Sequence, residues 1–183
     1  MIRVMVDSIR VSLLTQHRVV VLRETDSRRY LPIWIGPFEA EAIGMAIQGH
    51  EPQRPLTHDL LKATIGDMGG QITHIYVNDI QDNTFYARIV IEQQGQSIEV
   101  DARPSDAIAL AVRTEVPIYV ATHVLEQAGV FFEEDEQPSP ETTAGPDTEG
   151  EPEPSDDSLS IFRNFINTLD LDNPGKGGPE KSS

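Results

Sequence analysis

The segment with the greatest concentration of reactive side chains reads Asp-Ala-Arg-Pro-Ser-Asp, at a predicted junction between a strand and a helix. It contains two carboxylates, a guanidinium and a hydroxyl, contributed by Asp101, Asp106, Arg103 and Ser105. Helix N-termini favour anions, and paired carboxylates can hold a hard divalent cation. Phosphodiester hydrolysis uses such groups, because a cation stabilises the developing charge and a base activates water. A structural interpretation is also open, since Asp106 stabilises a helix dipole and Arg88 can neutralise Asp101.

A second segment, Arg-Pro-Leu-Thr-His-Asp, has the same layout of arginine, proline and polar groups at a predicted helix start. Its polar members are Arg54, Thr57, His58 and Asp59. His58 can exchange a proton near neutral pH, and Asp59 can bind a metal ion or orient a histidine. The structural alternative is that Thr57 caps the helix and its neighbours are simply exposed. The match between the two segments is too short to indicate an internal repeat.

Glu39 and Glu41 form a third candidate group, in the first turns of a helix predicted over residues 37–48. Residues two apart on a helix point in different directions, so at most one of them should reach any given site. Stabilisation of the helix dipole is the structural alternative for both carboxylates.

Several kinds of active site are absent from the sequence. The chain has no cysteine, which excludes disulfides, zinc–thiolate clusters and a thiol nucleophile. Its five histidines show no zinc-binding spacing, and it has neither a glycine-rich phosphate loop nor a nucleophile elbow. The short N-terminal apolar pattern is broken by charges, so we expect neither a signal peptide nor a membrane span and predict a cytoplasmic protein.

Charge is distributed unevenly along the chain, whose formal net charge is −16. Residues 133–183 hold 14 acidic and 3 basic side chains, a net charge of −11, while residues 1–132 have an ordinary, mildly acidic composition. A negative surface opposes tight, phosphate-driven binding of nucleic acid. Any nucleic-acid partner is therefore expected to bind weakly or transiently.

The clearest structural pattern is a β-hairpin. Apolar residues alternate on both sides of Gln94-Gly95, which is typical of two strands joined by a two-residue turn. Counting outward from the turn pairs Ile91 with Ile98, Ile89 with Val100 and Ala87 with Ala102. All three pairs are apolar, so one face of the hairpin should be buried.

The remaining pattern predicts an α+β domain, with a mostly antiparallel sheet and three to four packed helices. Valine-rich or alternating stretches predict strands, and helical periodicity bounded by proline and glycine predicts helices. Residues 107–112 are apolar on all sides of their helix, so we expect that helix to be buried on most sides. Leu61, Ile65 and Met68 repeat at helical spacing, which indicates a helix that ends at Gly69-Gly70. Besides the hairpin, strands are expected near residues 2–13, 17–23, 31–35, 72–77 and 117–120, and helices near 37–48, 57–68, 104–113 and 121–128.

The predicted domain covers residues 1–132. Residues 133–157 are rich in acids, proline and threonine and poor in apolar side chains, so we expect a disordered acidic linker. Residues 158–171 carry an apolar stripe at helical spacing and predict a short amphipathic helix that docks on the domain or on a protein partner. Residues 172–183 are again expected to be disordered.

Three segments together resemble the bifunctional nuclease domain family. They are Leu-Pro-Ile-Trp-Ile-Gly-Pro-Phe-Glu-Ala from residue 31, Arg-Pro-Leu-Thr-His-Asp-Leu-Leu from residue 54, and Asp-Ala-Arg-Pro-Ser-Asp-Ala-Ile-Ala-Leu-Ala from residue 101. The likeness covers roughly residues 1–130. It implies a compact α+β domain that associates with itself, so a homo-oligomer is expected, and nuclease activity on DNA and RNA.

The residues and the resemblance together predict a metal-assisted phosphodiesterase of low turnover. A divalent cation, Mg²⁺ or Mn²⁺, would lie between Asp101 and Asp106, with help from Glu41 or Asp59. His58 would act as general base.

The substrate-binding residues predicted for this site are Arg103, Arg54, Ser105 and Thr57, of which the arginines would hold phosphate. The competing hypothesis is a non-enzymatic regulatory or scaffold module, acting through self-association and the helix 158–171. Its support in the sequence is an acidic surface without a recognisable catalytic constellation.

Overall fold

The computed structural model describes residues 1–11 and 17–131. Apart from Val11, these residues belong to one compact unit of the chain. The predicted acidic linker 133–157, the helix 158–171 and the terminal segment 172–183 lie outside the described residues.

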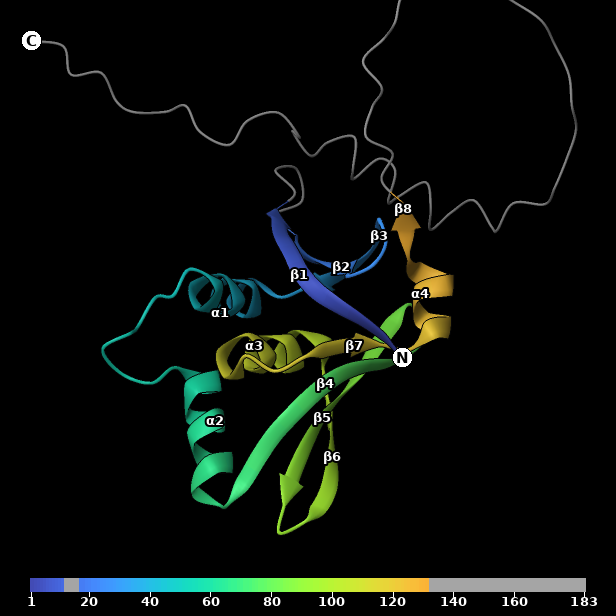
Figure 1. Ribbon diagram of the computed structural model, residues 1–183. Coiled ribbons are helices and arrows are strands. Elements are labelled where there is room, and N and C mark those ends of the chain that lie inside the picture. The colour runs from blue at the N-terminus through green and yellow to red at the C-terminus, as the bar shows by residue number, and fades with distance from the viewer. Residues whose placement is uncertain (12–16, 132–183) are drawn as a thin grey trace, which may run out of the picture. The chain divides into compact units, whose positions relative to one another are not determined.

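In the described part of the chain, eight strands form a single sheet in the order β6-β5-β4-β7-β1-β2-β3-β8 (Figure 1). The strands are β1 (Ile2–Val11), β2 (Arg18–Glu24), β3 (Arg29–Ile35), β4 (Gly70–Gln81), β5 (Thr84–Gln93), β6 (Gln96–Ala102), β7 (Ile118–Val120) and β8 (Val130–Phe131). The β4–β7 pair is parallel, whereas the β1–β7, β2–β3, β3–β8, β4–β5 and β5–β6 pairs are antiparallel. The predicted α+β class with a mostly antiparallel sheet is confirmed.

The β5–β6 hairpin has the register that its alternating pattern predicts. Ile91 pairs with Ile98, and the next apolar pairs follow in step down to Ala87 and Ala102. The turn residues Gln94 and Gly95 both have positive φ angles, 51° and 76°. Two consecutive positive φ angles match the right-handed twist of the flanking strands, which explains why a short turn sets the register of the whole hairpin.

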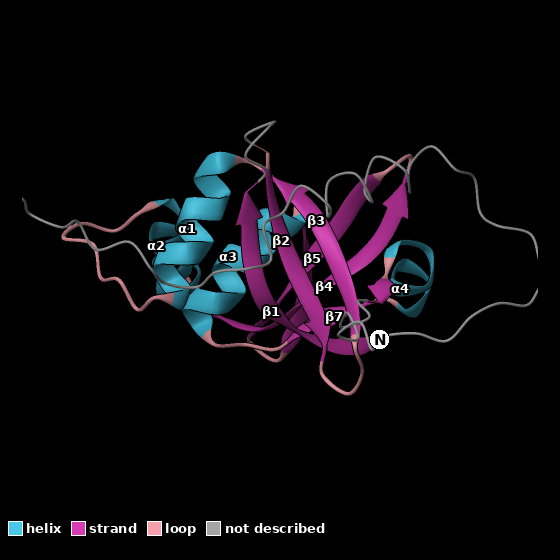
Figure 2. Cartoon of the chain, turned by 90° about the horizontal axis from the view of Figure 1, so that it is seen from above, coloured by secondary structure: helices cyan, strands magenta, loops and turns pink. Residues whose placement is uncertain are grey.

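Four helices lie in the described residues: α1 (Pro37–Ile47), α2 (Thr57–Asp67), α3 (Pro104–Thr114) and α4 (Thr122–Ala128). Figure 1 shows α3 between α1 and α2, and α3 packs against both. Figure 2 shows α1, α2 and α3 gathered at one end of the strands and α4 at the other. None of these helices is both long and apolar enough to cross a membrane.

The core of the domain surrounds α3. Five consecutive residues of this helix, from Ala107 to Ala111, are buried, as its apolar sequence on all sides predicts. They pack with apolar residues of the sheet and of α1, including Ile75, Leu31 and Ile43. Because small alanines alternate with larger side chains, α1 and α2 can approach α3 closely, and the two ends of α3 are held in place.

Helix α2 forms where its apolar spacing predicts it, but most of its apolar side chains are not buried. Leu61 is 38% exposed and Met68, which lies just after the helix, is 70% exposed. Helix α2 packs mainly through His58 and Ile65, because it touches α3 and β4 along one narrow side. The helix therefore presents apolar side chains outside the core.

The predicted cap of α2 is also wrong. Thr57 is the first residue of the helix rather than its N-cap, which is Leu56. The Asp59 carboxylate supplies the capping interaction instead, because Oδ2 accepts a hydrogen bond from the Leu56 N–H at 2.9 Å. Asp59 thus has a structural role at the helix start.

Candidate active site

The starts of three helices border one pocket of about 590 Å³. Helix α1 begins at Pro37 and α3 at Pro104, while α2 follows Pro55 closely; in each case proline restricts the backbone before or at the first turn. The residues that line the pocket are Phe38, Glu39, Glu41, Ala42, Met45, Pro55, Leu56, Thr57, His58, Arg103 and Asp106. Segments distant in the sequence therefore meet at one solvent-accessible site.

Arg103, the N-cap residue of α3, bridges two carboxylates in this pocket. Its Nε donates to Oδ2 of Asp106 at 2.6 Å, and its Nη2 donates to Oδ1 of the same group at 3.0 Å. Nη2 also donates to Oε1 of Glu39 at 2.7 Å. The guanidinium fork matches the planar carboxylate of Asp106, so α1 and α3 are tied together at their first turns.

His58 completes this chain of contacts from the side of α2. Its Nε2 lies 3.4 Å from Oδ1 of Asp106, the same oxygen that accepts a hydrogen bond from Arg103. The imidazole is nearly buried, with 11% of its side chain exposed. The site therefore contains a series in which carboxylates alternate with nitrogen-bearing side chains: Glu39, Arg103, Asp106 and His58.

Two charges in this series stabilise each other. Burial acts to raise the pKa of Asp106, but the hydrogen bonds and positive charge of Arg103, helped by His58, hold that pKa below its usual value. The hydrogen bonds to Asp106 and Glu39 raise the pKa of Arg103. Asp106 is thus an anion at neutral pH and can accept a hydrogen bond from the imidazole.

A glycine gives the Glu39 side chain room to reach Arg103. A Cβ atom placed on Gly36 would overlap with Oε2 of Glu39. The backbone of Gly36 is extended, with φ at −69°, so its conformation does not require glycine. A larger residue at position 36 would therefore displace the Glu39 carboxylate, which is the end of a flexible side chain.

At the other end of α3, Arg113 makes a second arginine–carboxylate contact. Its Nε donates to Oδ1 of Asp59 at 2.7 Å. Its Nη1 donates to the carbonyl of Ala109 at 2.8 Å and its Nη2 to the carbonyl of Ala42 at 3.0 Å. Because only 7% of the Arg113 side chain is exposed, this contact joins α1, α2 and α3 in the interior.

The pocket brings together five of the residues predicted for the site: His58, Asp106, Arg103, Thr57 and Glu41. Glu39 lines the same pocket as Glu41, and of the two it is Glu39 that binds Arg103. The pocket extends around the start of α1, and two side chains that point in different directions can therefore both border it.

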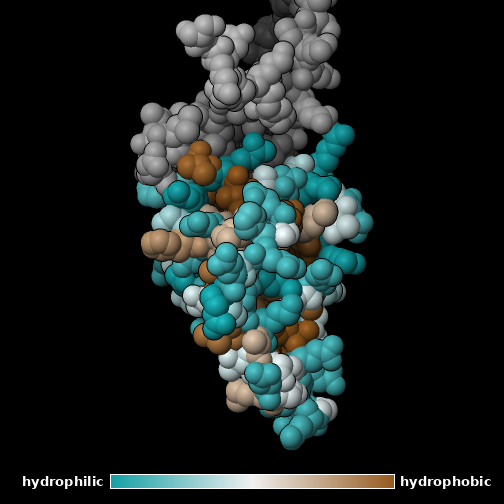
Figure 3. All heavy atoms as spheres, turned by 90° about the vertical axis from the view of Figure 1, so that its left-hand side faces the viewer, coloured by the Kyte–Doolittle hydropathy of each residue, from teal (hydrophilic) through white to brown (hydrophobic). Residues whose placement is uncertain are grey.

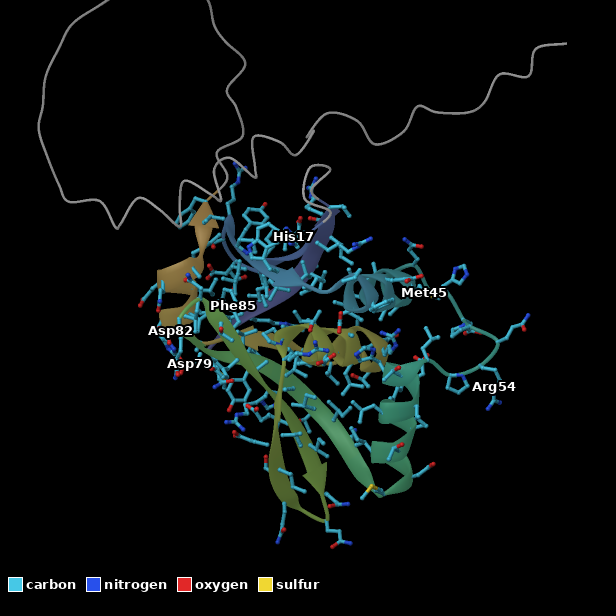
Figure 4. The ribbon with its side chains drawn as sticks, turned by 180° about the vertical axis from the view of Figure 1, so that it is seen from behind. His17, Met45, Arg54, Asp79, Asp82 and Phe85 are labelled. Atoms are coloured by element: carbon cyan, nitrogen blue, oxygen red, sulfur yellow. The ribbon has the colours of Figure 1, made fainter. Side chains whose placement is uncertain are left out.

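Four other predicted residues are placed elsewhere. Asp101 is 68% exposed and pairs with Arg88 at 3.6 Å on β5. Ser105 is buried and does not line the pocket. Arg54 lies on the exposed loop between α1 and α2, which extends out beyond the helices (Figure 4), and Asp59 faces Arg113.

The arrangement of carboxylates does not match the predicted cation site. In residues 1–11 and 17–131, no group of three or more His, Asp or Glu side chains could hold a metal ion. Asp106 and Asp101 are engaged with different arginines, and Glu39 shares Arg103 with Asp106. Each of these three carboxylates has a guanidinium group as its partner, and Asp101 and Asp106 do not share one.

Some residues of the site were not identified from the sequence. The sequence indicates Glu39 only as one of two alternative carboxylates, and it predicts no role for Phe38, Met45 or Arg113. Figure 4 shows Met45 on α1. A usable signal existed for Arg113, because a basic residue in the last turn of a buried helix must find acceptors nearby. No pattern in the sequence marks Phe38 as a pocket residue.

Comparison with known proteins gives a family match across the folded domain. The family model described as the bifunctional nuclease domain matches residues 20–133. An uncharacterized protein of Mycobacterium tuberculosis is 41% identical over 169 residues, which cover 92% of this chain and 95% of that protein.

Plant proteins of the same kind match over a shorter range. Bifunctional nuclease 2 of Oryza sativa subsp. japonica is 30% identical over 118 residues, 63% of this chain and 36% of that protein. Bifunctional nuclease 1 of Arabidopsis thaliana is 26% identical over 118 residues, 62% of this chain and 36% of that protein. The match spans about a third of the length of these plant relatives.

Proposed function

Because this chain belongs to the bifunctional nuclease domain family, we propose that it hydrolyses phosphodiester bonds of DNA and RNA at the pocket between the starts of α1, α2 and α3. The observation that carries the proposal is the series Glu39–Arg103–Asp106–His58 along the wall of an open pocket. It combines an acid–base group, a carboxylate that orients it and a guanidinium, which are the groups that hydrolysis of a phosphodiester uses.

In the proposed mechanism, His58 acts as the general base. A tautomer protonated at Nε2 donates to Asp106 and leaves Nδ1 able to accept a proton from water. Asp106 holds the ring in this tautomer and stabilises the positive charge that forms on it. Since Asp106 is anchored by Arg103, the orientation of the imidazole depends on both residues.

Arg103 is the proposed phosphate-binding group. Its side chain is 66% exposed, and the contacts to Asp106 and Glu39 use Nε and Nη2, so the N–H groups of Nη1 can donate to a phosphate oxygen. The two carboxylates offset much of the positive charge of Arg103. Weak substrate binding and low turnover are the expected consequences.

No step of this mechanism passes through a metal ion. The divalent cation expected from the sequence stays a prediction, and dialysis against EDTA followed by return of Mg²⁺ or Mn²⁺ tests it. Activity that survives EDTA would assign the chemistry to His58 and Arg103 alone, whereas activity restored only by the cation would add a ligand set that forms when substrate binds.

The test of the proposed function compares three variants of full-length protein purified through two orthogonal columns. His58→Ala and Asp106→Asn should each lower cleavage of single-stranded DNA and RNA by about 100-fold, the usual contribution of acid–base catalysis. Asp101→Asn is the matched control, because Asp101 lies outside the pocket, and it should cleave at the wild-type rate. Circular dichroism checks that all three are folded.

Two outcomes would contradict the proposal. Unchanged cleavage by Asp106→Asn would exclude this pocket as the active site. Nuclease activity that fails to co-elute with the protein would indicate a contaminant and favour the non-enzymatic regulatory module.

A further inference from the structure

Phe38 is exposed to an unusual degree for a large aromatic side chain beside a candidate active site. It is the second residue of α1 and 80% of its surface is accessible. Leaving a phenyl ring in water forgoes the free energy that its burial in the core would provide. An exposed aromatic residue at the edge of a pocket is a common feature of ligand-binding sites.

Phe38 lies at the boundary between two pockets. One is the candidate active site, with Arg103, Asp106 and His58. The other, of about 640 Å³, is lined by Ile9, Arg18, Pro37, Phe38, Ala40, Glu41, Gly44 and Gln48. Phe38 and Glu41 line both, so the two hollows adjoin across the phenyl ring, and each holds one arginine.

We propose that Phe38 is the platform on which a base of single-stranded nucleic acid stacks while the chain crosses from one pocket to the other. The inference rests on the proposed nuclease function. Each of the two pockets that Phe38 lines contains one arginine, Arg18 or Arg103, to which a phosphate next to the stacked base could bind. Stacking on an aromatic side chain accepts any base, which suits a site that acts on both DNA and RNA.

The charges around Phe38 indicate that bases rather than phosphates supply most of the affinity. The active-site pocket holds Glu39, Glu41 and Asp106 against Arg103, and the whole chain is strongly acidic. A site that neutralises few phosphates releases few counterions, so its affinity depends weakly on salt. For one or two phosphate contacts, the slope of log affinity against log salt should be only about −1 for single strands.

The platform also predicts a preference for unpaired substrates. A base must leave its helical stack before it can lie on a protein ring, and unstacking a paired base costs a few kcal/mol. Single strands and loops avoid most of this cost. The same nucleotides should therefore bind more weakly in a duplex than as a single strand.

An exposed apolar surface could instead bind a second copy of this chain. Figure 3 shows the side of the domain on which α1 and α2 lie, where apolar side chains interrupt a largely hydrophilic surface. The exposed apolar residues of these helices include Phe38, Ile47, Leu60 and Leu61. Phe38 differs from the other three because it alone lines a pocket that contains Arg103 and His58.

The test measures binding of labelled oligothymidylate and of an abasic oligomer of equal length by fluorescence anisotropy, using full-length His58→Ala protein to prevent cleavage. Adding Phe38→Ala should weaken binding of oligothymidylate about tenfold, because the variant loses the stacking of one base on an aromatic ring. Binding of the abasic oligomer should not change, because it has phosphates but no bases. Phe38→Trp should restore or improve binding of oligothymidylate.

Ile47→Ala serves as the matched control, because Ile47 is an exposed apolar residue of α1 that lines neither pocket, and it should leave both affinities unchanged. The stacking role would be overturned if Phe38→Ala weakened binding of oligothymidylate and of the abasic oligonucleotide equally, or weakened neither. A change in sedimentation from oligomer to monomer on Phe38→Ala would assign the ring to an interface between copies and overturn it as well.

The nuclease proposal can fail separately. Wild-type protein that does not cleave oligothymidylate but binds it through Phe38 would refute hydrolysis and support the stacking platform. If wild-type protein cleaves oligothymidylate and Phe38→Ala has the same KM, hydrolysis is supported and the stacking platform is refuted.

Discussion

The two ends of α3 carry the same chemical pair, an arginine and an aspartate from a helix start, in opposite environments. At the N-terminal end, Arg103 is 66% exposed and binds the carboxylates of Asp106 and Glu39. At the C-terminal end, Arg113 is 7% exposed and binds Asp59 together with two backbone carbonyls. The first pair lines the pocket that contains His58. The second pair borders a different pocket and fixes the packing of three helices.

The difference shows which arginine is available for chemistry. All three nitrogens of Arg113 donate to protein acceptors, so this side chain has a structural role. Arg103 makes contacts only with side chains that can move, and it faces solvent. A buried arginine whose donors are all satisfied stabilises the fold, while an exposed arginine with donors to spare can bind a substrate.

The largest expected effect on stability comes from Arg113→Ala. Removal of the guanidinium leaves the Asp59 carboxylate and the carbonyls of Ala109 and Ala42 without their donor, so we expect the free energy of unfolding to fall by about 2–4 kcal/mol. Urea unfolding followed by circular dichroism measures this change. A decrease of less than about 1 kcal/mol in the free energy of unfolding would show that Arg113 stabilises the fold no more than Arg103 does.

Arg103→Ala should show the opposite balance. Because Arg103 is largely exposed, its removal should lower the free energy of unfolding by less than about 1 kcal/mol. Cleavage of single-stranded DNA should fall by roughly 10- to 100-fold, because the phosphate loses a charged donor and Asp106 loses its anchor. Arg103→Lys, which keeps the charge but not the fork, should recover only part of the rate. Full activity in Arg103→Ala would remove the functional half of the comparison.

Low pH should weaken the arginine–aspartate contacts at both ends of α3. Protonation of Asp59 should account for the larger part of the lost stability. Burial acts to raise the pKa of Asp59, but the Leu56 N–H, Arg113 and His58 together hold that pKa below the ordinary value of 3.8. A lowered folded-state pKa stabilises the protein above pH 3.8, and this stabilisation is lost as the pH falls through the lower pKa.

Asp59→Asn should therefore be less stable than wild type by about 1 kcal/mol at pH 7, and the difference should shrink below pH 4. Asp106→Asn provides the comparison. The pKa of Asp106 in the wild type is also lowered, because the effect of Arg103 outweighs that of burial. In the variant, however, Glu39 can still pair with Arg103. The free energy of unfolding at pH 7 should therefore fall less in Asp106→Asn than in Asp59→Asn. Melting curves from pH 7 to pH 3 measure both, and parallel curves for Asp59→Asn and wild type would contradict the prediction.

The smallest effect is expected for Gly36→Ala. The added methyl group displaces the Glu39 carboxylate, so Arg103 keeps Asp106 but loses its second partner. Stability should change by less than about 0.5 kcal/mol, because the backbone at Gly36 suits alanine. The rate of cleavage should change a few-fold, and in the same direction in Glu39→Gln. Different effects in these two variants would show that Gly36 acts through another contact.

Much of the fold follows from local patterns. The β5–β6 hairpin was predicted with its register, because alternation of side chains along strands and a two-residue turn leave a single consistent pairing. The burial of α3 was predicted as well, because a helix that is apolar on all sides has no stable place except the interior. The helical spacing of Leu61, Ile65 and Met68 indicates α2 correctly, but it does not determine burial, and Leu61 and Met68 remain exposed.

For the candidate site, the sequence by itself determined which residue types stand at the helix starts: His58, Arg103 and Asp106 were all identified there. Only the tertiary structure decided their partners. Asp59 and Asp106 are both acids in a first helical turn, yet one binds the nearly buried Arg113 and the other binds the exposed Arg103 in the pocket of His58. Local sequence sets the direction of a side chain relative to its own helix, but the contacts it makes depend on how distant helices pack around α3.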